Sequence, residues 1–265
     1  MNASEPVALV TGSTRGIGRA TAELFAASGH RVVVHGIREE ECDETLRAIR
    51  AAGGHAGAVA ADLTREEAPE QLIDAAHAVY GRLDVLVNNA GANVFTGTLG
   101  TSGAQWRHAV DLDLRAVWLC AKAAAPRLER PGAIVNVASN HAFSTMAGAF
   151  PYNVAKAGVV ALGQSLALEL TPEGIRVNTV CPGYIDTPLN DTYFGGFADP
   201  AHERARVEAL HPVRRIGAPQ DVARAIRFLA DEREAGFITG THLLVDGGRS
   251  ALMQDPAPER PAAQP

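Results

Sequence analysis

The stretch "VALVTGSTRGIGRATAELFAASG", residues 7–29, decides the fold. It joins an apolar strand, a glycine-rich turn and a helix with apolar residues at helical spacing. Gly12 permits a tight turn, Gly16 lets the backbone approach a phosphate, and Gly18 allows close packing of the helix on the strand. The helix N-terminus presents free N–H groups and a positive dipole end. The unit therefore predicts a dinucleotide site, although its G-x-x-x-G-x-G spacing also fits an ordinary tight turn.

The same alternation continues along the chain and predicts the α/β class. Helical spacing recurs in the longer stretches between further apolar runs. We expect a single-domain Rossmann fold: a doubly wound parallel sheet of about seven strands with helices on both faces. The domain should span 1–250, and a Pro/Ala-rich tail, 251–265, should be disordered or loosely draped. The further apolar runs that we expect to form strands are 31–35, 56–61, 83–91, 133–139, 175–183 and 242–248.

Composition narrows the class of protein. The chain has 265 residues, a net charge of -6 and no basic run, which argues against nucleic acid or anionic membrane as a partner. Cys42, Cys120 and Cys181 lie far apart and predict buried free thiols in a reducing compartment. The N-terminus lacks the features of a signal peptide, and no apolar run approaches membrane-spanning length. We therefore expect a cytoplasmic protein.

The end of the second strand bears on which nucleotide binds. In "VVVHGIREEE", 32–41, Gly36 stands where an NAD site usually has an acid, and Arg38 follows it. Arg15 lies inside the glycine turn. Two guanidinium groups suit a 2′-phosphate, so this pattern favours NADP over NAD. The alternative is that both arginines are solvated and that Glu39 to Glu41 neutralise Arg38.

A tyrosine, a lysine and a serine in residues 138–156 suggest chemistry. Tyr152 and Lys156 share one face of a predicted helix, and Ser139 ends a predicted strand. A phenol has a pKa of about 10, and a nearby ammonium favours the phenolate. Lowering that pKa by roughly 3 units takes about 4 kcal/mol, of which Lys156 could supply part and an oxidised nicotinamide more. The Ser139 hydroxyl would polarise a carbonyl oxygen, so the group suits hydride transfer at a carbonyl. A lysine–tyrosine pair alone, however, is more often a helix-surface pair.

These motifs together resemble the short-chain dehydrogenase/reductase family over residues 6 to about 250. "TGSTRGIG" (11–18) is similar to the family's cofactor turn, "DL" (62–63) to its adenine contact, "NNAG" (88–91) to its post-strand motif, and "PGYIDT" (182–187) to the segment that flanks the nicotinamide amide. Ser139, Tyr152 and Lys156 match the catalytic positions within 139–156. The resemblance implies NADP or NAD as cofactor and no metal. The implied cofactor contacts are Gly12, Ser13, Thr14, Arg15, Gly16, Ile17, Gly18, Arg38, Asp62, Leu63, Asn89, Ala90, Gly91, Tyr152, Lys156, Pro182, Gly183, Ile185 and Thr187.

One position departs from the family pattern. Asp113 stands where the family usually has asparagine, whose backbone carbonyl is thought to hold a proton-relay water. We expect the backbone carbonyl of Asp113 to suffice, because a carboxylate facing Lys156 would weaken the charge that activates Tyr152. The alternatives are a carboxylate near Lys156 that changes the pH profile, a misaligned count, or an aspartate that faces solvent.

The substrate is the least determined property. In the family, the segment matching 186–212 closes over the substrate, and we expect aromatic and polar residues from it, with Asn140 and His141, to line the site. One reading is a 3-oxoacyl-acyl-carrier-protein reductase, with Arg127 and Arg130 as the basic patch for an acidic carrier. The alternative is a sugar (aldose or polyol) dehydrogenase. The family also implies a homotetramer. The residues of the loop that carry this expectation are Asn190, Asp191, Tyr193, Phe194, Phe197, His202 and Arg204.

Other classes fit less well. A serine hydrolase using Ser139 and His141 lacks the G-x-S-x-G turn. The nine histidines show no spacing typical of metal ligands. A non-catalytic NADP-binding regulator would typically lack Tyr152 or Lys156, and both are present.

Overall fold

Seven parallel strands form one sheet in the computed structural model, which describes residues 5–188 and 194–252. The strand order is β3-β2-β1-β4-β5-β6-β7, which confirms the predicted doubly wound α/β fold. Every run predicted as a strand contains one, although the fourth and seventh strands are shorter than predicted. Their bounds are β1 Val7–Val10, β2 Arg31–Gly36, β3 Ala56–Ala60, β4 Val85–Asn88, β5 Gly132–Val137, β6 Ile175–Pro182 and β7 His242–Val245.

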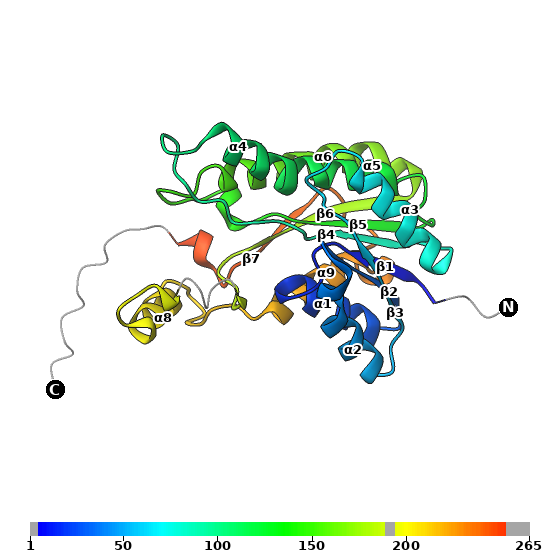
Figure 1. Ribbon diagram of the computed structural model, residues 1–265, viewed down its shortest axis with the longest axis horizontal. Coiled ribbons are helices and arrows are strands. Elements are labelled where there is room, and N and C mark those ends of the chain that lie inside the picture. The colour runs from blue at the N-terminus through cyan, green and yellow to red at the C-terminus, as the bar shows by residue number, and fades with distance from the viewer. Residues whose placement is uncertain (1–4, 189–193, 253–265) are drawn as a thin grey trace.

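Helices cover both faces of the sheet, as Figure 1 shows. On one face, α1, α2 and α9 bury Phe25, Ile49 and Ile226 against the strands. On the other, α3, α5 and α6 bury Leu72 and Cys120. Because both faces are covered, β1, β5 and β6 are buried throughout, and β1 is apolar along its whole length. The helices are α1 Gly16–Ala27, α2 Asp43–Ala51, α3 Ala68–Tyr80, α4 Gly103–Val110, α5 Ala116–Ala124, α6 Tyr152–Leu170, α8 Pro200–Ala209, α9 Pro219–Ala230 and α10 Glu232–Ala235.

The strand order reverses between β1 and β4, and this reversal positions the site. The chain runs outward from β1 to β3, then returns to place β4 on the other side of β1. The connections that leave β1 and β4 therefore diverge and open a crevice at the carboxyl ends of the strands. The glycine turn follows β1, "NNAG" begins at the end of β4, and Ser139 follows β5.

Helix α6 contradicts the expectation that no apolar run approaches membrane-spanning length. The segment Tyr152–Glu173 is long and apolar enough to cross a membrane by length and composition alone. Its apolar side chains, however, serve the core of the fold: Val159 packs with Cys181 of β6, and Leu166 packs with Val177. We therefore interpret α6 as a core helix that covers the sheet. Cys42, Cys120 and Cys181 are buried free thiols, as predicted.

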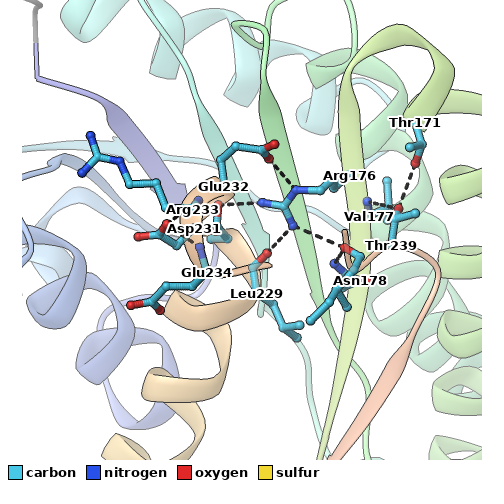
Figure 2. A network of polar contacts seen from close by, with 12 residues as sticks. Thr171, Arg176, Val177, Asn178, Leu229, Asp231, Glu232, Arg233, Glu234 and Thr239 are labelled. Carbon is cyan, nitrogen blue, oxygen red and sulfur yellow. Dashed lines mark hydrogen bonds and ion pairs between the residues drawn. The ribbon is translucent and has the colours of Figure 1, made fainter. Parts of the chain in front are cut away.

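The amino end of β6 is fixed to the end of α9 by a buried arginine (Figure 2). The Arg176 side chain is only 5% exposed. Its guanidinium donates to the carbonyls of Leu229 at 2.7 Å and Ala230 at 3.1 Å, and to the carboxylate of Glu232 at 2.8 Å. These bonds satisfy carbonyls that the end of a helix leaves without partners. The network lies at the amino end of β6, whereas Ser139 lies beyond the carboxyl end of β5, so the network stabilises the fold away from the cavity.

Candidate active site

The glycine turn is closed by contacts that leave no room for side chains. Gly12 has φ +61°, and a Cβ there would lie 2.9 Å from the Cα of Ala90. A Cβ on Gly18 would lie 2.2 Å from the carbonyl oxygen of Gly12, so α1 packs directly on the turn. Asn89 donates through Nδ2 to the carbonyls of Thr11 and Gly12 at 2.9 and 3.0 Å. Asn89, predicted as a cofactor contact, thus also holds the turn in shape.

His35 holds the other side of the turn, and sequence reasoning missed it. Its Nδ1 accepts the N–H of Gly12 at 3.0 Å, and its Nε2 lies 3.1 Å from the carbonyl of Ala61. Ser13 donates its N–H to the carbonyl of His35 at 2.9 Å and accepts the N–H of His35 through Oγ, also at 2.9 Å. Burial lowers the pKa of His35 to about 4, which keeps the ring neutral and Nδ1 able to accept. A sequence signal for this role did exist, because His35 directly precedes Gly36 at the end of a buried strand, next to the predicted cofactor site.

The two arginines of the predicted 2′-phosphate site differ in their contacts. Arg38 lies at the surface after β2 and forms an ion pair with Glu41 at 2.8 Å, as the alternative reading anticipated. Arg15 is exposed at the N-terminal cap of α1. Gly36 is buried, and a Cβ there would lie 2.7 Å from Cγ2 of Thr14. The absence of a carboxylate at position 36 therefore also serves packing.

The predicted adenine contact combines an exposed and a buried residue. Asp62 is exposed and accepts bonds from the backbone N–H and the hydroxyl of Thr64 at 3.1 and 2.7 Å. These bonds lower the pKa of Asp62, so the carboxylate is charged at neutral pH. Leu63 is buried in the core, 4% exposed.

Ser139, Tyr152 and Lys156 come together at one cavity, although the residues between them form only short turns. Ser139 caps a single 3₁₀ turn after β5, and α6 begins at Tyr152. Lys156, one helical turn further on, is 4% exposed and donates to the carbonyl of Val137 at 3.2 Å. Its Nζ lies 5.6 Å from the ring centre of Tyr152. The cation therefore lies over the ring of Tyr152, beside it as the spacing predicted.

Asp113 does not lie as we expected. It is fully buried on a π-helical turn, Asp111–Arg115, which excludes a solvent-facing aspartate. Its Oδ1 lies 3.5 Å from Nζ of Lys156 and accepts the N–H of Ala92 at 3.0 Å. The expectation that the carboxylate would avoid Lys156 is therefore wrong. The physical reason is that burial makes a charge partner necessary, and the wider π turn brings the side chain toward α6.

The pKa of Tyr152 is raised above its ordinary value, contrary to the lowered pKa that we expected. Burial is the largest cause, because it disfavours the phenolate. Lys156 and a hydrogen bond with Ser139 act in the expected downward direction, but Asp113 adds to the upward shift. Lys156 has a raised pKa: burial lowers it, but Asp113 and Tyr152 outweigh that effect. The ammonium therefore stays charged beside the phenol.

A cavity of about 500 Å³ joins the cofactor turn to these groups. Phe95 and His141 flank the phenol, with ring centres 5.2 and 5.9 Å from that of Tyr152. Seven lining residues were not among the predicted contacts. Those that follow β4 were detectable by the rule that ligands bind beyond the carboxyl ends of strands, whereas Met146 carried no such signal. The seven are Ala92, Asn93, Phe95, Val137, Ala138, Met146 and Tyr184, and the predicted ones are Ile17, Asn89, Gly91, Ser139, Asn140, His141, Tyr152, Lys156, Pro182, Gly183, Ile185 and Thr187.

The described part of the predicted substrate loop packs mainly on itself. Phe194 is 5% exposed in a cluster with Val207 and Ile216, and Arg204 pairs with Asp186. Phe197 and His202 are exposed. None of Phe194, Phe197, His202 and Arg204 lines the cavity, so for these residues the predicted lining is wrong. Asn190, Asp191 and Tyr193 lie outside the described residues.

Two other classes of site find no geometric support. His141 donates its backbone N–H to Oγ of Ser139 at 3.2 Å, while Nδ1 of its ring lies 3.0 Å from the hydroxyl of Thr145. The imidazole is therefore not placed as a base for Ser139. Across residues 5–188 and 194–252, no group of three His, Cys, Asp or Glu side chains is placed to hold a metal ion.

Comparisons with known proteins agree with this geometry. A family profile described as Enoyl-(Acyl carrier protein) reductase matches residues 12–250. The chain is 42% identical to 3beta-hydroxysteroid dehydrogenase 1 of Eggerthella lenta, over 91% of this chain and 92% of that protein. It is 43% identical to cis-4-hydroxycyclohexanecarboxylate dehydrogenase of Sinomonas cyclohexanicum, over 94% and 98%. It is 38% identical to 3-oxoacyl-[acyl-carrier-protein] reductase of Synechocystis, over 91% and 96%.

The fold has close structural relatives as well. The ligand-free aldohexose dehydrogenase of Thermoplasma acidophilum superposes with a TM-score of 0.86 at 34% identity, covering 96% of this chain and 98% of that one. These matches extend over nearly the whole chain. The chain therefore belongs to the short-chain dehydrogenase/reductase family, whose members are oxidoreductases that act on CH–OH and C=O groups.

Proposed function

We propose that this protein is an NAD(P)-dependent oxidoreductase that transfers hydride between a nicotinamide and a secondary alcohol or its ketone. One observation carries the proposal: a single cavity is lined by Ile17 of the glycine turn, by Ser139, and by Tyr152 and Lys156. A turn suited to phosphate, a hydroxyl, a phenol and a buried ammonium thus open on the same space. A non-catalytic NADP-binding protein would have no need of the last two groups.

The residues present fit a dinucleotide. The turn from Gly12 to Gly18 is a cradle that Cβ atoms would fill, and it leads into the N-terminus of α1. Asp62 and Leu63 would hold the adenine end, and Ala90 and Gly91 would lie along the cofactor. Lys156 would hold the nicotinamide ribose, while Pro182, Gly183, Ile185 and Thr187 would flank the nicotinamide, whose bound form supplies or accepts the hydride.

Side chains of the protein would transfer the proton to and from the substrate oxygen. The Ser139 hydroxyl would donate a hydrogen bond to the substrate oxygen as that oxygen gains charge during reduction. Tyr152 would give its proton to the same oxygen during reduction and take it back during oxidation. Lys156 would stabilise the phenolate that remains, because its ammonium lies close to the phenol in a site shielded from water.

We propose NADP as the preferred cofactor. Arg15, exposed at the cap of α1, is the better placed cation, because Arg38 is already paired with Glu41. Calorimetry should give tighter binding of NADP than of NAD, and the double variant Arg15→Ala, Arg38→Ala should lose that difference. Equal or tighter binding of NAD by the unaltered protein would assign these arginines to another task.

The cavity favours a compact cyclic substrate. Phe95, Met146 and Tyr184 give it apolar and aromatic walls, and Asn93, Asn140 and His141 add hydrogen-bonding groups. A lining that combines aromatic and polar side chains suits an alicyclic ring with one or two polar substituents. The two relatives at 42% and 43% identity are named for a hydroxysteroid and a hydroxycyclohexanecarboxylate, which supports this class.

A 3-oxoacyl-acyl-carrier-protein reductase is the second candidate, supported by the relative at 38% identity. The basic patch that we expected for the carrier is misplaced, however. Arg127 and Arg130 precede β5, whereas Ser139 follows it, so about 20 Å of strand separates them. Arg127 also pairs with Asp74 at 2.5 Å. A sugar dehydrogenase stays a further candidate, because the structural relative is an aldohexose dehydrogenase and Asn93, Asn140 and His141 line the cavity.

A substrate panel tests the proposal. Hydroxycyclohexanecarboxylates, hydroxysteroids, free aldoses and 3-oxoacyl thioesters would each be offered with NAD and NADP in both directions, following nicotinamide absorbance. We expect the highest kcat/KM among the alicyclic compounds. A kcat/KM for thioesters at least tenfold above that for every alicyclic compound would favour the second candidate. Absence of turnover with all four classes, while cofactor binds, would favour a binding protein.

We also propose that the enzyme works in the cytoplasm as a homotetramer. Three buried free thiols are compatible with a reducing compartment. The apolar residues of β7, Leu243 and Leu244, are partly exposed at the edge of the sheet and would be covered by a second copy.

A further inference from the structure

The buried carboxylate of Asp113 is the least ordinary group beside the proposed proton donor. None of its surface is exposed, and its Oδ1 lies 3.5 Å from Nζ of Lys156. A charge so deeply buried is strongly unfavourable without a partner, and Lys156 is that partner. The pair lies directly beside Tyr152, whose ring is 5.6 Å from the same Nζ.

The surrounding chain leaves room for this pair. A Cβ on Gly91 would lie 2.4 Å from Oδ1 of Asp113 and 3.2 Å from Nζ of Lys156, so any side chain at position 91 would displace one of them. The N–H of Ala92 holds Oδ1 in place at 3.0 Å. The other oxygen, Oδ2, is buried and has no hydrogen-bond partner among the described residues. Burial raises the pKa of Asp113, and Lys156 is the chief group that opposes this rise and favours the charged carboxylate.

The consequence for Tyr152 follows from the sign of that charge. Lys156 favours the phenolate, but an anion beside Lys156 opposes it, and burial strengthens both interactions. An asparagine could contact Nζ of Lys156 through its own Oδ1, as Asp113 does, but it would carry no negative charge. Asp113 and asparagine at this position thus differ in electrostatics far more than in shape.

We propose that Asp113 is a positioning residue whose carboxylate fixes Lys156 and holds the proton on Tyr152, so that proton exchange with substrate occurs at higher pH than it would with asparagine. The statement rests on the proposed function only where it concerns substrate. The ionisation of the phenol itself is a property of the chain. The pKa of Tyr152 is raised mainly by burial, and Asp113 adds to the rise, in the direction that this role requires.

Other titratable groups act on this cluster from the neighbouring elements. His108 of α4 acts on Asp113, and Cys181 of β6 acts on both Tyr152 and Lys156. Burial raises the pKa of Cys181 to about 12, so its thiol is neutral in the working range. The variant His108→Asn, made both in the unaltered protein and in Asp113→Asn, shows whether the His108 ring contributes to a shift in the pKa of Tyr152.

The first test measures phenol ionisation without substrate or cofactor. Ultraviolet phenolate absorbance is followed against pH in the unaltered protein and in Asp113→Asn, each with and without Tyr152→Phe, and the difference isolates Tyr152. We expect Asp113→Asn to lower the apparent pKa of Tyr152 by about one unit. Asp111→Asn is the matched control, because Asp111 lies on the same π turn but pairs with Arg115 at 3.0 Å. It should leave the titration unchanged.

The second test uses the pH–rate profile. In Asp113→Asn, the basic limb of kcat/KM for reduction and the acid limb for oxidation should both move to lower pH by the same amount. Cofactor affinity, measured by calorimetry, reports whether Lys156 has moved. Asp113→Ser also removes the charge and must shift the titration with the same sign, which keeps the test valid if Asp113→Asn folds poorly.

The outcomes separate this inference from the proposed function. A phenol titration that stays fixed, or moves to higher pH because Lys156 has lost its own proton, overturns the inference even if the enzyme turns over substrate. A downward shift in the Tyr152 titration supports the role of Asp113 even if the protein turns over no compound of the substrate panel. In that case the proposed reaction is refuted and the inference about Asp113 stands.

Discussion

The proton on Tyr152 is held by groups that oppose one another. Burial and Asp113 raise the pKa of the phenol, while Lys156 and Ser139 lower it. Ser139 and Lys156 are 4% exposed, so neither contribution is screened by bulk water. Chemistry at this residue therefore depends on a small difference between large effects, which single substitutions can tip.

Replacing Tyr152 with phenylalanine should separate chemistry from binding. Tyr152→Phe removes the proton donor but keeps the ring that Phe95 and His141 pack against. We expect kcat to fall by about 10² to 10⁴, the usual contribution of a general acid. The Kd for cofactor, measured by calorimetry, should stay within a few-fold. Turnover close to that of the unaltered protein, in a folded variant, would remove Tyr152 from the mechanism.

His35 should make the cofactor turn sensitive to acid. Its pKa is about 4 in the folded protein and 6.5 ordinarily, because burial disfavours the imidazolium. The unfolded chain therefore binds a proton between these values that the folded protein does not, so stability falls as pH drops from about 6.5 to 4. The difference corresponds to about 3 kcal/mol when fully expressed.

The variant His35→Asn tests this, since asparagine cannot titrate but has an oxygen that can accept the N–H of Gly12. The free energy of unfolding, from urea titrations, should fall less steeply with acid than in the unaltered protein. His55→Asn, at an exposed histidine, is the control and should follow the unaltered curve. Parallel curves for all three proteins would show that His35 does not resist protonation.

At the scale of elements, the packing of α6 on β6 places the catalytic pair. Gly163 faces Thr179, and a Cβ there would lie 2.4 Å from the hydroxyl oxygen of Thr179. Because α6 also carries Tyr152 and Lys156 at its start, any displacement of the helix moves both groups relative to Ser139, which follows β5. The close approach of helix and strand is thus a condition for the geometry of the cavity.

Gly163→Ala should therefore reduce both stability and activity. Overpacking costs about 1–3 kcal/mol, which outweighs the roughly 1 kcal/mol that alanine gains over glycine in a helix. Thr179→Ala removes the obstructing hydroxyl, so in that background Gly163→Ala should instead stabilise the protein. Unfolding free energies and kcat/KM for the four proteins of this cycle give the answer. The same loss in both backgrounds would show that the contact with Thr179 is not the cause.

Over the whole molecule, exposed apolar side chains indicate association. Leu168 of α6 is 80% exposed, and Trp118 of α5 is 44% exposed. Strand β7 lies at the edge of the sheet, with Leu243 and Leu244 at 37% and 41% exposure. An uncovered sheet edge with apolar side chains is a ready surface for a second copy.

We predict a tetramer by light scattering at micromolar concentration, and Leu244→Lys should weaken it by burying an unpaired charge. Leu99→Lys is the control, because Leu99 is fully exposed in a loop and should not affect assembly. A monomer mass for the unaltered protein would refute the prediction. A tetramer that Leu244→Lys leaves intact would place the interface elsewhere.

The sequence by itself determined the class of fold and the identity of the reactive groups. A strand such as β1 was readable because burial on both faces favours continuous apolar residues. Tyr152 and Lys156 were readable because residues four apart share a helix face, a relation that depends only on local geometry.

Only the tertiary structure decided which distant groups act on them. The pairing of Asp113 with Lys156, the bond from Gly12 to His35, and the walls formed by Phe95 and Met146 join elements that the sheet order brings together. Sequence spacing carries no information about such contacts, because they depend on how helices pack over the strands. The charge balance at Tyr152 is likewise set by burial, and burial exists only once the whole chain has folded.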